Sequence, residues 1–402
     1  FPEPPVKGPG ILTFSGGFCA IAYDYCADIG LDVPGLSPHI KAELTPQLPD
    51  YIPPSNPLDL GTEALWKPEI TGIGTKGLID DPALGSVLVI IATMSPIQQR
   101  IFGHNFLEAM KDSPKPAVIS LPSCDLDPDF EAKMRDYGII YSGSAERTIT
   151  AAGLVTFHGR ALERNKRAVE HKQFDNLPAL DKGTVAEWKG KELLRAIGIQ
   201  VPEGGLAKTV EEAIATAERV GYPVAIKAQS SALAHKTEAG GVILSLGNAD
   251  AVRDAWTTLH ENIQRAQPGV VLDGVLVEKM AAKGLELVVG AKRDPKWGPI
   301  LLVGLGGIWI EAIGDVRLLP CDLAEEDIIE EIGKLRSAKL LDAFRGSPPV
   351  DVKALAKTVS LVGRLMMTRP EIVEIDINPV FAHAEGQGVT AVDALIVTQT
   401  AE

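Results

Sequence analysis

A chain of 402 residues is too long for one ordinary hydrophobic core, so two or three domains are expected. The formal net charge of −14 argues against nucleic-acid binding, which needs a basic face, and 45% hydrophobic with 23% charged residues is typical of a folded soluble protein. The four cysteines are widely separated and form no Cys-x-x-Cys pair, which argues against a disulfide framework and a structural zinc site.

The first ten residues contain four prolines and no methionine, a composition typical of a linker between domains. We therefore expect that the amino-terminal part of a longer polypeptide precedes them. The longest apolar run, residues 87–94, has the length and β-branched composition of a buried strand and is too short to span a membrane. We expect a cytoplasmic protein with no membrane partner.

Residues 10–158 alternate short apolar strands with helical patterns. The expected strands are 10–14, 86–93, 117–121 and 138–141, and the expected helices are 18–29, 96–111 and 128–136. Strands that are apolar on both faces and alternate with helices predict a parallel sheet with right-handed crossovers. The fold class predicted for this part is α/β, a doubly wound, flavodoxin-like domain.

Two turns of this first domain carry polar residues. Residues 13–17, Thr-Phe-Ser-Gly-Gly, follow the first strand and open a helix, where backbone N–H groups can bind an anion. Their adjacent glycines do not match a dinucleotide fingerprint, and we interpret them as a tight strand–helix turn. Residues 56–59, Asn-Pro-Leu-Asp, are interpreted as a structural turn.

The helical periodicity breaks at residues 174–181 after a charged helix tail, so we place a domain boundary there. The predicted domains are 1–160, flavodoxin-like, and 184–402, with a linker at 161–183. The second domain is predicted to be a mixed α+β region of two lobes around an antiparallel sheet. Its helices are expected at 187–197, 209–220, 249–265, 323–336 and 350–367, and its strands at 223–228, 241–246, 270–279, 285–292, 299–311, 372–380 and 389–396.

The loop at residues 234–242 carries the most informative residues of the chain. It places His235 just before Gly240 and Gly241 and shortly after a strand that ends at Lys227. A lysine and open backbone N–H groups can hold a triphosphate, and a neutral imidazole beside them can accept the terminal phosphoryl group. The alternative is that His235 is an ordinary polar loop residue.

A second polar set lies on the last strands. Side chains 374, 376 and 378 share one face of a strand, and the chain returns after the turn 384–388 to bring Asp393 near Asn378. Asp376, Asn378 and Asp393 together offer hard oxygen ligands suited to Mg²⁺ held against phosphates. The alternative is a solvated strand face.

Residues 184–396 resemble the ATP-grasp domain of the NDP-forming acyl-CoA synthetases, the relatives of succinyl-CoA synthetase and ADP-forming acetyl-CoA synthetase. The matching segments, in chain order, are 223–227, 235–242, 284–290, 297–299, 304–311, 344–346 and 374–379 with Asp393. Residues 10–160 resemble the flavodoxin-like ligase domain that precedes ATP-grasp in fused members. The fold implied is a flavodoxin-like domain followed by a two-lobed ATP-grasp domain.

The resemblance also implies roles for residues. The nucleotide-binding set is Lys227 as phosphate clamp, Gly240 and Gly241 in a mobile loop, Glu278, Lys279 and Met280 at the adenine hinge, Glu286 near the ribose or hinge, and Arg317, with Asp315, at the phosphates. The Mg²⁺ set is Asp376, Asn378 and Asp393. The catalytic pair is His235, which accepts the γ-phosphoryl group of ATP, and Glu311, which orients it.

The activity implied is that of an acid–thiol ligase, which converts an acid, CoA and ATP to acyl-CoA, ADP and phosphate through a phosphohistidine relay. Complete members also have a CoA-binding domain and a domain with a second phosphorylated histidine, and neither motif occurs here. We expect the chain to be the carboxy-terminal part of such an enzyme, with those domains as partners and a homo-oligomeric state. The alternatives are a regulatory module of an acetyltransferase that senses nucleotide or acyl-CoA, and another ATP-grasp carboxylate ligase.

Overall fold

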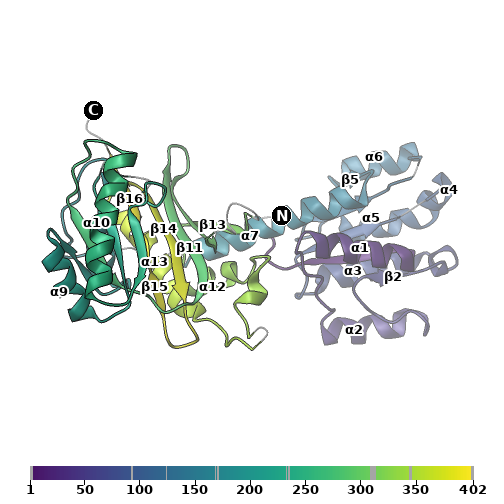
Figure 1. Ribbon diagram of the computed structural model, residues 1–402. Coiled ribbons are helices and arrows are strands. Elements are labelled where there is room, and N and C mark those ends of the chain that lie inside the picture. Colours follow the sequence, from purple (N-terminus) through teal and green to yellow (C-terminus); the bar gives the residue numbers. More distant parts are fainter. Residues whose placement is uncertain are drawn as a thin grey trace. The chain divides into compact units, whose positions relative to one another are not determined.

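The protein divides into two compact units, Phe1–Lys166 and Arg167–Glu402 (Figure 1). The computed structural model describes residues 3–91, 94–123, 125–167, 169, 172–231, 233, 236–307, 314–343 and 346–399. No helix of these ranges is long and apolar enough to cross a membrane.

Unit 1 is built on a five-stranded parallel sheet of order β2-β1-β3-β4-β5. Its strands are β1 (Pro9–Thr13), β2 (Leu58–Asp59), β3 (Ser86–Ile90), β4 (Ala117–Ser120) and β5 (Ile140–Ser142). This is the order of the flavodoxin-like doubly wound fold, and the predicted fold class of unit 1 is confirmed. The sequence missed β2, because two residues are too few to establish an alternating pattern.

Helices cover both faces of this sheet. The elements are α1 (Gly16–Asp28), α2 (Pro38–Leu44), α3 (Glu69–Asp80), α4 (Pro96–Gln98), a π-helical segment (Gln99–Gly103), α5 (His104–Met110), α6 (Pro128–Asp136) and α7 (Ala145–Asn165), with 3₁₀ turns at Thr45–Gln47 and Glu63–Leu65. Leu88 and Ile90 of β3 pack with α1 and α7, whereas Val87 and Val89 pack with α3, α5 and α6. The alternation along β3 therefore builds one core on each face.

Two departures from the expected helices have local causes. The helix expected at 96–111 is interrupted by the π-helical segment, at whose end Gly103 packs so tightly that a Cβ would lie 2.6 Å from the Phe130 ring. The sequence missed α3 because it contains three glycines, which lower helix propensity. Glycine is needed at two of these positions because a Cβ would come too close to a leucine. A Cβ on Gly74 would lie 3.0 Å from the Leu58 side chain, and one on Gly77 would lie 2.9 Å from that of Leu44.

Unit 2 contains two antiparallel sheets. The four-stranded sheet has the order β7 (Gly204–Ala207), β10 (Gly274–Lys279), β8 (Val224–Gln229) and β9 (Val242–Leu246), and it packs against α9 (Val210–Val220) and α10 (Ala249–Ala266). The larger sheet has the order β13 (Val316–Pro320), β12 (Gly298–Leu305), β11 (Leu285–Asp294), β14 (Ile372–Ala382), β16 (Leu395–Thr398) and β6 (Thr184–Val185), with β15 (Val389–Ala391) beside β14.

The larger sheet has one face covered by helices and one face that carries the polar residues of the predicted site. Helices α8 (Glu187–Ala196), α12 (Glu325–Ile332) and α13 (Val352–Thr368) pack with its apolar side chains, and a 3₁₀ turn lies at Ala338–Leu340. Along β14, Ile375 and Ile377 point into this core. Asp376 and Asn378 alternate with these two residues along the strand and therefore point to the opposite face of the sheet.

Asn56 fixes the start of β1 through three hydrogen bonds. Its Oδ1 accepts the N–H of Ile11 at 2.8 Å, and its Nδ2 donates to the carbonyls of Pro9 at 2.9 Å and Pro34 at 2.7 Å. These bonds give the turn at residues 56–59 a structural role. They replace the backbone partners that a longer β2 would have supplied.

We predict that Asn56→Ala destabilises β1 by about 2–4 kcal/mol, because it leaves a buried N–H and two carbonyls without their partner. Native-state hydrogen exchange of peptides covering β1 measures this directly. The matched control is Asn105→Ala, which removes a single partly buried bond to Pro68 and is expected to have a clearly smaller effect. Equal effects of the two substitutions would contradict the role assigned to Asn56.

Candidate functional site

A cluster of charged side chains is buried inside unit 2. It consists of Glu187 and Lys191 on α8, Lys227 on β8 and Glu278 on β10, which we call the lysine–glutamate cluster. The amine of Lys227 lies 2.7 Å from Glu187 Oε1 and 3.2 Å from Glu278 Oε2. The amine of Lys191 lies 2.8 Å from Glu187 and 2.6 Å from both oxygens of Glu278. Both amines also donate to the carbonyl of Val392, at 2.9 and 2.7 Å.

The local sequence brings these groups together. Glu187 and Lys191 are four residues apart and share one face of α8. Lys227 pairs in register with Leu276, two residues before Glu278, so both charged side chains point to the same face of the four-stranded sheet.

Lys236 extends the cluster toward the predicted metal ligands. Its amine lies 2.8 Å from Glu187 Oε2 and 2.9 Å from Asp393 Oδ1. It directly follows His235 in the chain. His235 and Glu311, the predicted catalytic pair, both lie outside the described residues.

The charges of the cluster depend on one another. Burial opposes the ionisation of Glu187, but Lys227, Lys191 and Lys236 outweigh it and hold the pKa of this carboxyl well below its ordinary value. Burial likewise opposes the charge of Lys227, but Glu187 and Glu278 outweigh it and raise its pKa. Burial and the nearby Lys227 lower the pKa of Lys191. With Lys236 and its second partner Asp393 included, three lysines face three carboxylates, so the formal charges balance (+3 − 3).

The three predicted metal ligands line one cavity. This cavity of about 260 Å³ is lined by Asp376, Asn378 and Asp393 together with Glu187, Gln229, Ser230 and Lys236, among others. Burial, and then the charges of Asp393 and Glu374, raise the pKa of Asp376. Two carboxylates that repel each other beside an amide oxygen form a donor set that a hard divalent cation fits.

The metal ligands are not a closed site by themselves. No group of three or more His, Cys, Asp or Glu residues in the described ranges is arranged to hold a metal ion. Asn378 Oδ1 accepts the N–H of Gly307 at 3.1 Å, and Asp393 Oδ1 also accepts its neighbour's backbone N–H. A cation here would need further oxygens, as Mg²⁺ has when it shares its shell between carboxylates and phosphates.

Glu286 lies at the metal end of the site. A Cβ on Gly307 would be 2.3 Å from Glu286 Oε2, and the N–H of the same glycine bonds to Asn378. Glu286 alternates with the buried Leu287, so it shares the open face of the larger sheet with Asp376. It does not line the cavity formed by the predicted hinge residues Lys279 and Met280.

The predicted hinge divides between two environments. The carboxylate of Glu278 points into the lysine–glutamate cluster, whereas Lys279 and Met280 line a separate cavity of about 480 Å³. The N–H of Lys279 donates to Glu203 at 2.8 Å, and that of Met280 donates to Pro223 at 3.0 Å. In this conformation both hinge N–H groups are already bonded to backbone carbonyls.

Gly240 and Gly241 end a tight turn. The N–H of Gly240 donates to Thr237 at 3.1 Å and that of Gly241 to Lys236 at 2.8 Å, with Gly240 at φ +68°, which is the bonding of a Schellman motif. Asn262 of α10 donates to the Gly240 carbonyl at 3.1 Å. Both N–H groups are therefore engaged, and the glycines anchor the end of the loop to α10 instead of offering donors to a phosphate.

Arg317 does not join the other predicted residues. It pairs in register with the buried Val303 and so points to the helix-covered face of the larger sheet, where its guanidinium binds Glu331 of α12 at 2.5 Å. Asp315, its expected companion, accepts the N–H groups of Arg336 and Ser337 at 3.0 and 2.8 Å. Both residues hold α12 and the turn after it against the sheet.

Sequence reasoning missed the residues that contact Lys227. Glu187, Lys191 and Gln229 were not predicted, although the Glu–Lys pair four residues apart at the start of a helix is visible in the sequence. Gln229 Oε1 accepts the N–H of Trp188 at 3.0 Å and helps to place the first turn of α8. An exposed i,i+4 pair gives the same pattern, so the pattern alone does not indicate burial.

Comparison with known proteins shows what the chain is similar to. Residues 178–398 match the family model described as "ATP-grasp domain". Trans-feruloyl-CoA synthase FCS1, from an unknown prokaryotic organism, is 37% identical over 98% of this chain and 56% of its own length. The acetate–CoA ligase [ADP-forming] I subunit beta of Pyrococcus furiosus is 37% identical over 58% of this chain and 97% of its own length.

The chain is also similar to a solved structure of an acetyl-coenzyme A synthetase. It is the dinucleotide forming acetyl-coenzyme A synthetase 1 of Ca. Korarchaeum cryptofilum, in complex with coenzyme A and acetyl-coenzyme A and with a phosphorylated phosphohistidine segment. It matches with a TM-score of 0.50 and 35% identity, over 54% of this chain and 94% of that chain. The present chain spans only 56% of the length of the feruloyl-CoA synthase.

We predict that Glu187→Gln destabilises unit 2 by about 3 kcal/mol, because it leaves buried lysines without their counter-charge. Unfolding in urea is followed by tryptophan fluorescence, to which unit 2 contributes four of the five tryptophans. Glu192→Gln, on the exposed face of the same helix, is the control and should leave the midpoint unchanged. An unchanged midpoint for Glu187→Gln as well would show that the cluster does not support the fold.

Proposed function

Because the chain belongs to the ATP-grasp family, in the branch of the NDP-forming acyl-CoA synthetases, we propose that it is the nucleotide-binding part of an ADP-forming acid–thiol ligase. The complete reaction converts a carboxylic acid, CoA and ATP to acyl-CoA, ADP and phosphate. Since ATP and CoA are its substrates, we place it in the cytoplasm. The observation that carries the proposal is the cavity that Asp376, Asn378 and Asp393 line together with Lys236 and Glu187, the member of the lysine–glutamate cluster that reaches it.

We propose that Lys227, as the phosphate clamp, and Lys236 supply positive charge to a polyphosphate; of these two residues, Lys236 lines the cavity. Lys191 and Lys227 are held by Glu187, Glu278 and the Val392 carbonyl, so no reorganisation is needed to aim them. A bound Mg²⁺ ion, held by Asp376, Asn378 and Asp393, would neutralise charge on the phosphates.

His235 is proposed as the acceptor of the phosphoryl group. A neutral imidazole nitrogen attacks the γ-phosphorus, the bond from that phosphorus to the β,γ-bridging oxygen breaks, and ADP leaves. Glu311 is proposed to orient the imidazole. Lys236, which directly follows the histidine in the chain, forms ion pairs with Glu187 and with Asp393, one of the proposed metal ligands.

The remaining steps need groups that this chain does not supply. We propose that a CoA-binding domain and a second phosphohistidine domain are its partners, in the same polypeptide or as another subunit, and that the assembly is a homo-oligomer. The Pyrococcus relative named as a subunit beta supports the separate-subunit form. A sensor module is the second candidate, but it would not need a complete set of metal ligands beside a lysine-rich cluster.

We predict that the purified chain incubated with Mg²⁺ and γ-labelled ATP becomes labelled, and that His235→Asn abolishes the label. Phosphohistidine is acid-labile and base-stable, so the label is identified by its stability. The control is His260→Asn, whose exposed ring on α10 contacts the Trp256 carbonyl and lies outside the cavity. Label that persists in His235→Asn would overturn the assignment of the acceptor. ATP binding without any label, also after addition of the proposed CoA-binding and second phosphohistidine domains, would favour the sensor.

We predict that Asp376→Asn raises the Mg²⁺ concentration needed for half-maximal nucleotide binding about tenfold, since losing roughly 1.4 kcal/mol of ligand interaction corresponds to a factor of ten. A fluorescent ATP analogue titrated at several Mg²⁺ concentrations measures this. Glu374→Gln is the control, because this residue lies two positions earlier on β14 and its carboxylate pairs with Lys292 at 3.4 Å. An equal shift in both variants would mean that only the general negative charge matters.

A further inference from the structure

Unit 1 contains a cavity that the proposed reaction does not use. It has a volume of about 580 Å³ and lies between strands β3, β4 and β5 and one face of α7. We call it the α7 pocket. Its lining residues are Pro5, Ser86, Leu88, Met110, Lys111, Ser113, Lys115, Pro116, Ala117, Val118, Tyr137, Gly138, Ile139, Ile140, Ser142, Arg147, Thr148, Ala151, Ala152 and Val155. This volume is in the range of small-molecule sites.

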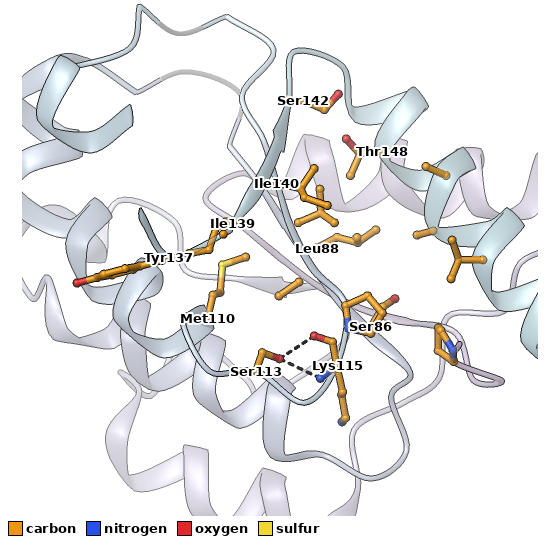
Figure 2. Close-up of a pocket in the computed structure, with 18 of the residues that line it drawn as sticks. Ser86, Leu88, Met110, Ser113, Lys115, Tyr137, Ile139, Ile140, Ser142 and Thr148 are labelled. Carbon is orange, nitrogen blue, oxygen red and sulfur yellow. Dashed lines mark hydrogen bonds between the residues drawn. The ribbon is translucent and has the colours of Figure 1, made fainter. Parts of the chain in front are cut away.

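The body of the pocket is apolar. In Figure 2, Leu88, Ile139, Ile140 and Met110 lie in its middle, between Ser113 and Lys115 at one end and Ser142 and Thr148 at the other. Apart from Arg147, the α7 side is made of the smaller residues Thr148, Ala151, Ala152 and Val155, which leave space that larger side chains would have filled.

A buried hydroxyl without a partner lies in this wall. Ser86 is 2% exposed, and its Oγ makes no hydrogen bond in the structure. A buried hydroxyl without a partner costs about 1–3 kcal/mol, and a polar atom of a ligand would remove this cost. By contrast, the hydroxyls of Ser142 and Thr148 both donate to the Ser144 carbonyl.

Every charged residue of the lining is basic. Lys111, Lys115 and Arg147 line the pocket and no Asp or Glu does, although acidic residues outnumber basic ones in the chain by 53 to 39. No carboxylate of the described residues lies within 4.0 Å of these three groups. Asp80 and Asp81 act on Lys115, and Glu108 on Lys111, from beyond ion-pair distance.

The end of the pocket that carries the lysines is held in place. Ser113 Oγ donates to the Lys115 carbonyl at 2.9 Å and accepts its N–H at 3.2 Å, which are the dashed lines of Figure 2. The Lys111 amine lies 4.8 Å from the centre of the Tyr137 ring, and the Lys115 amine donates to the Asp81 carbonyl. Asp81 itself already accepts hydrogen bonds from Ser37 and Ala83.

We propose that the α7 pocket binds a small monocarboxylate with an aryl or aliphatic body. The body lies against Leu88, Ile139 and Ile140, and the carboxylate lies at the end that carries Lys111 and Lys115. Ser86 provides a hydrogen bond to a polar atom within the ligand. The pocket belongs to unit 1, so this proposal does not depend on the nucleotide site of unit 2.

The test is calorimetric titration of the purified chain with 4-phenylbutyrate. We expect binding that Ala151→Phe weakens at least tenfold, because the new ring fills the pocket from an exposed helix position. The control Leu154→Phe places the same ring on α7 at an exposed residue that does not line the pocket, and it should bind normally. Unchanged binding in Ala151→Phe, or no binding at all to the native chain, would overturn the proposal.

The acidic group is tested separately. We expect Lys111→Gln to weaken 4-phenylbutyrate about fivefold or more, as expected for loss of a charge-assisted contact, with the exposed Lys41→Gln as control. The neutral 4-phenylbutan-1-ol should bind the native chain more weakly than the acid and should not respond to Lys111→Gln. Equal affinity for the acid and the alcohol would refute the assigned ligand class.

Discussion

The carboxylate of Glu187 is the interaction on which unit 2 most depends. It accepts Lys227 and Lys191 through one oxygen and Lys236 through the other, so a single side chain joins α8, the four-stranded sheet and the loop after it. The amines of Lys191 and Lys227 also donate hydrogen bonds to the carbonyl of Val392, which lies next to the larger sheet. Buried charge therefore joins the two sheets, each of which has its own apolar cluster.

A buried network of ion pairs destabilises the fold unless each charged group in it has a partner. Removing one partner of a buried ion pair leaves an uncompensated charge, whereas a fully paired network is held in one geometry. Lys236 bridges Glu187 of this network and Asp393, so the three lysines face three carboxylates. Glu187 and Lys236, which join these elements, also line the cavity of the three proposed metal ligands.

Fold and site differ in how far the sequence predicts them. The parallel sheet of unit 1 and the antiparallel sheets of unit 2 followed from apolar periodicity, because buried strands must be apolar on the faces that they bury. Alternation also placed Asp376 and Asn378 on one face of β14. Periodicity carries no such information for short or glycine-rich elements, and β2 and α3 were missed for that reason.

Some predicted site residues make other contacts in the structure, and they show a second limit of prediction from sequence. Arg317 follows a glycine-rich strand as the phosphate-binding hypothesis requires, but a shift of one position along β13 exchanges the two faces of the sheet. Its partner Glu331 lies on a helix whose packing no local pattern reveals. Gly240 and Gly241 likewise have the composition of a phosphate loop, yet the same residue type also ends a helical turn. Composition of a motif predicts its chemistry only when register is known.

Both basic regions of this chain lie within an acidic protein. The net charge of −14 disfavours the approach of an anion from a distance, but salt screens this repulsion beyond about 8 Å at physiological ionic strength. Inside that distance the cluster around Lys227 and the lysines of the α7 pocket act through apolar surroundings, where a charge has a stronger effect than in water. The two proposed anion sites therefore depend on a few lysines near buried surface, whereas the overall charge affects how the protein meets other macromolecules.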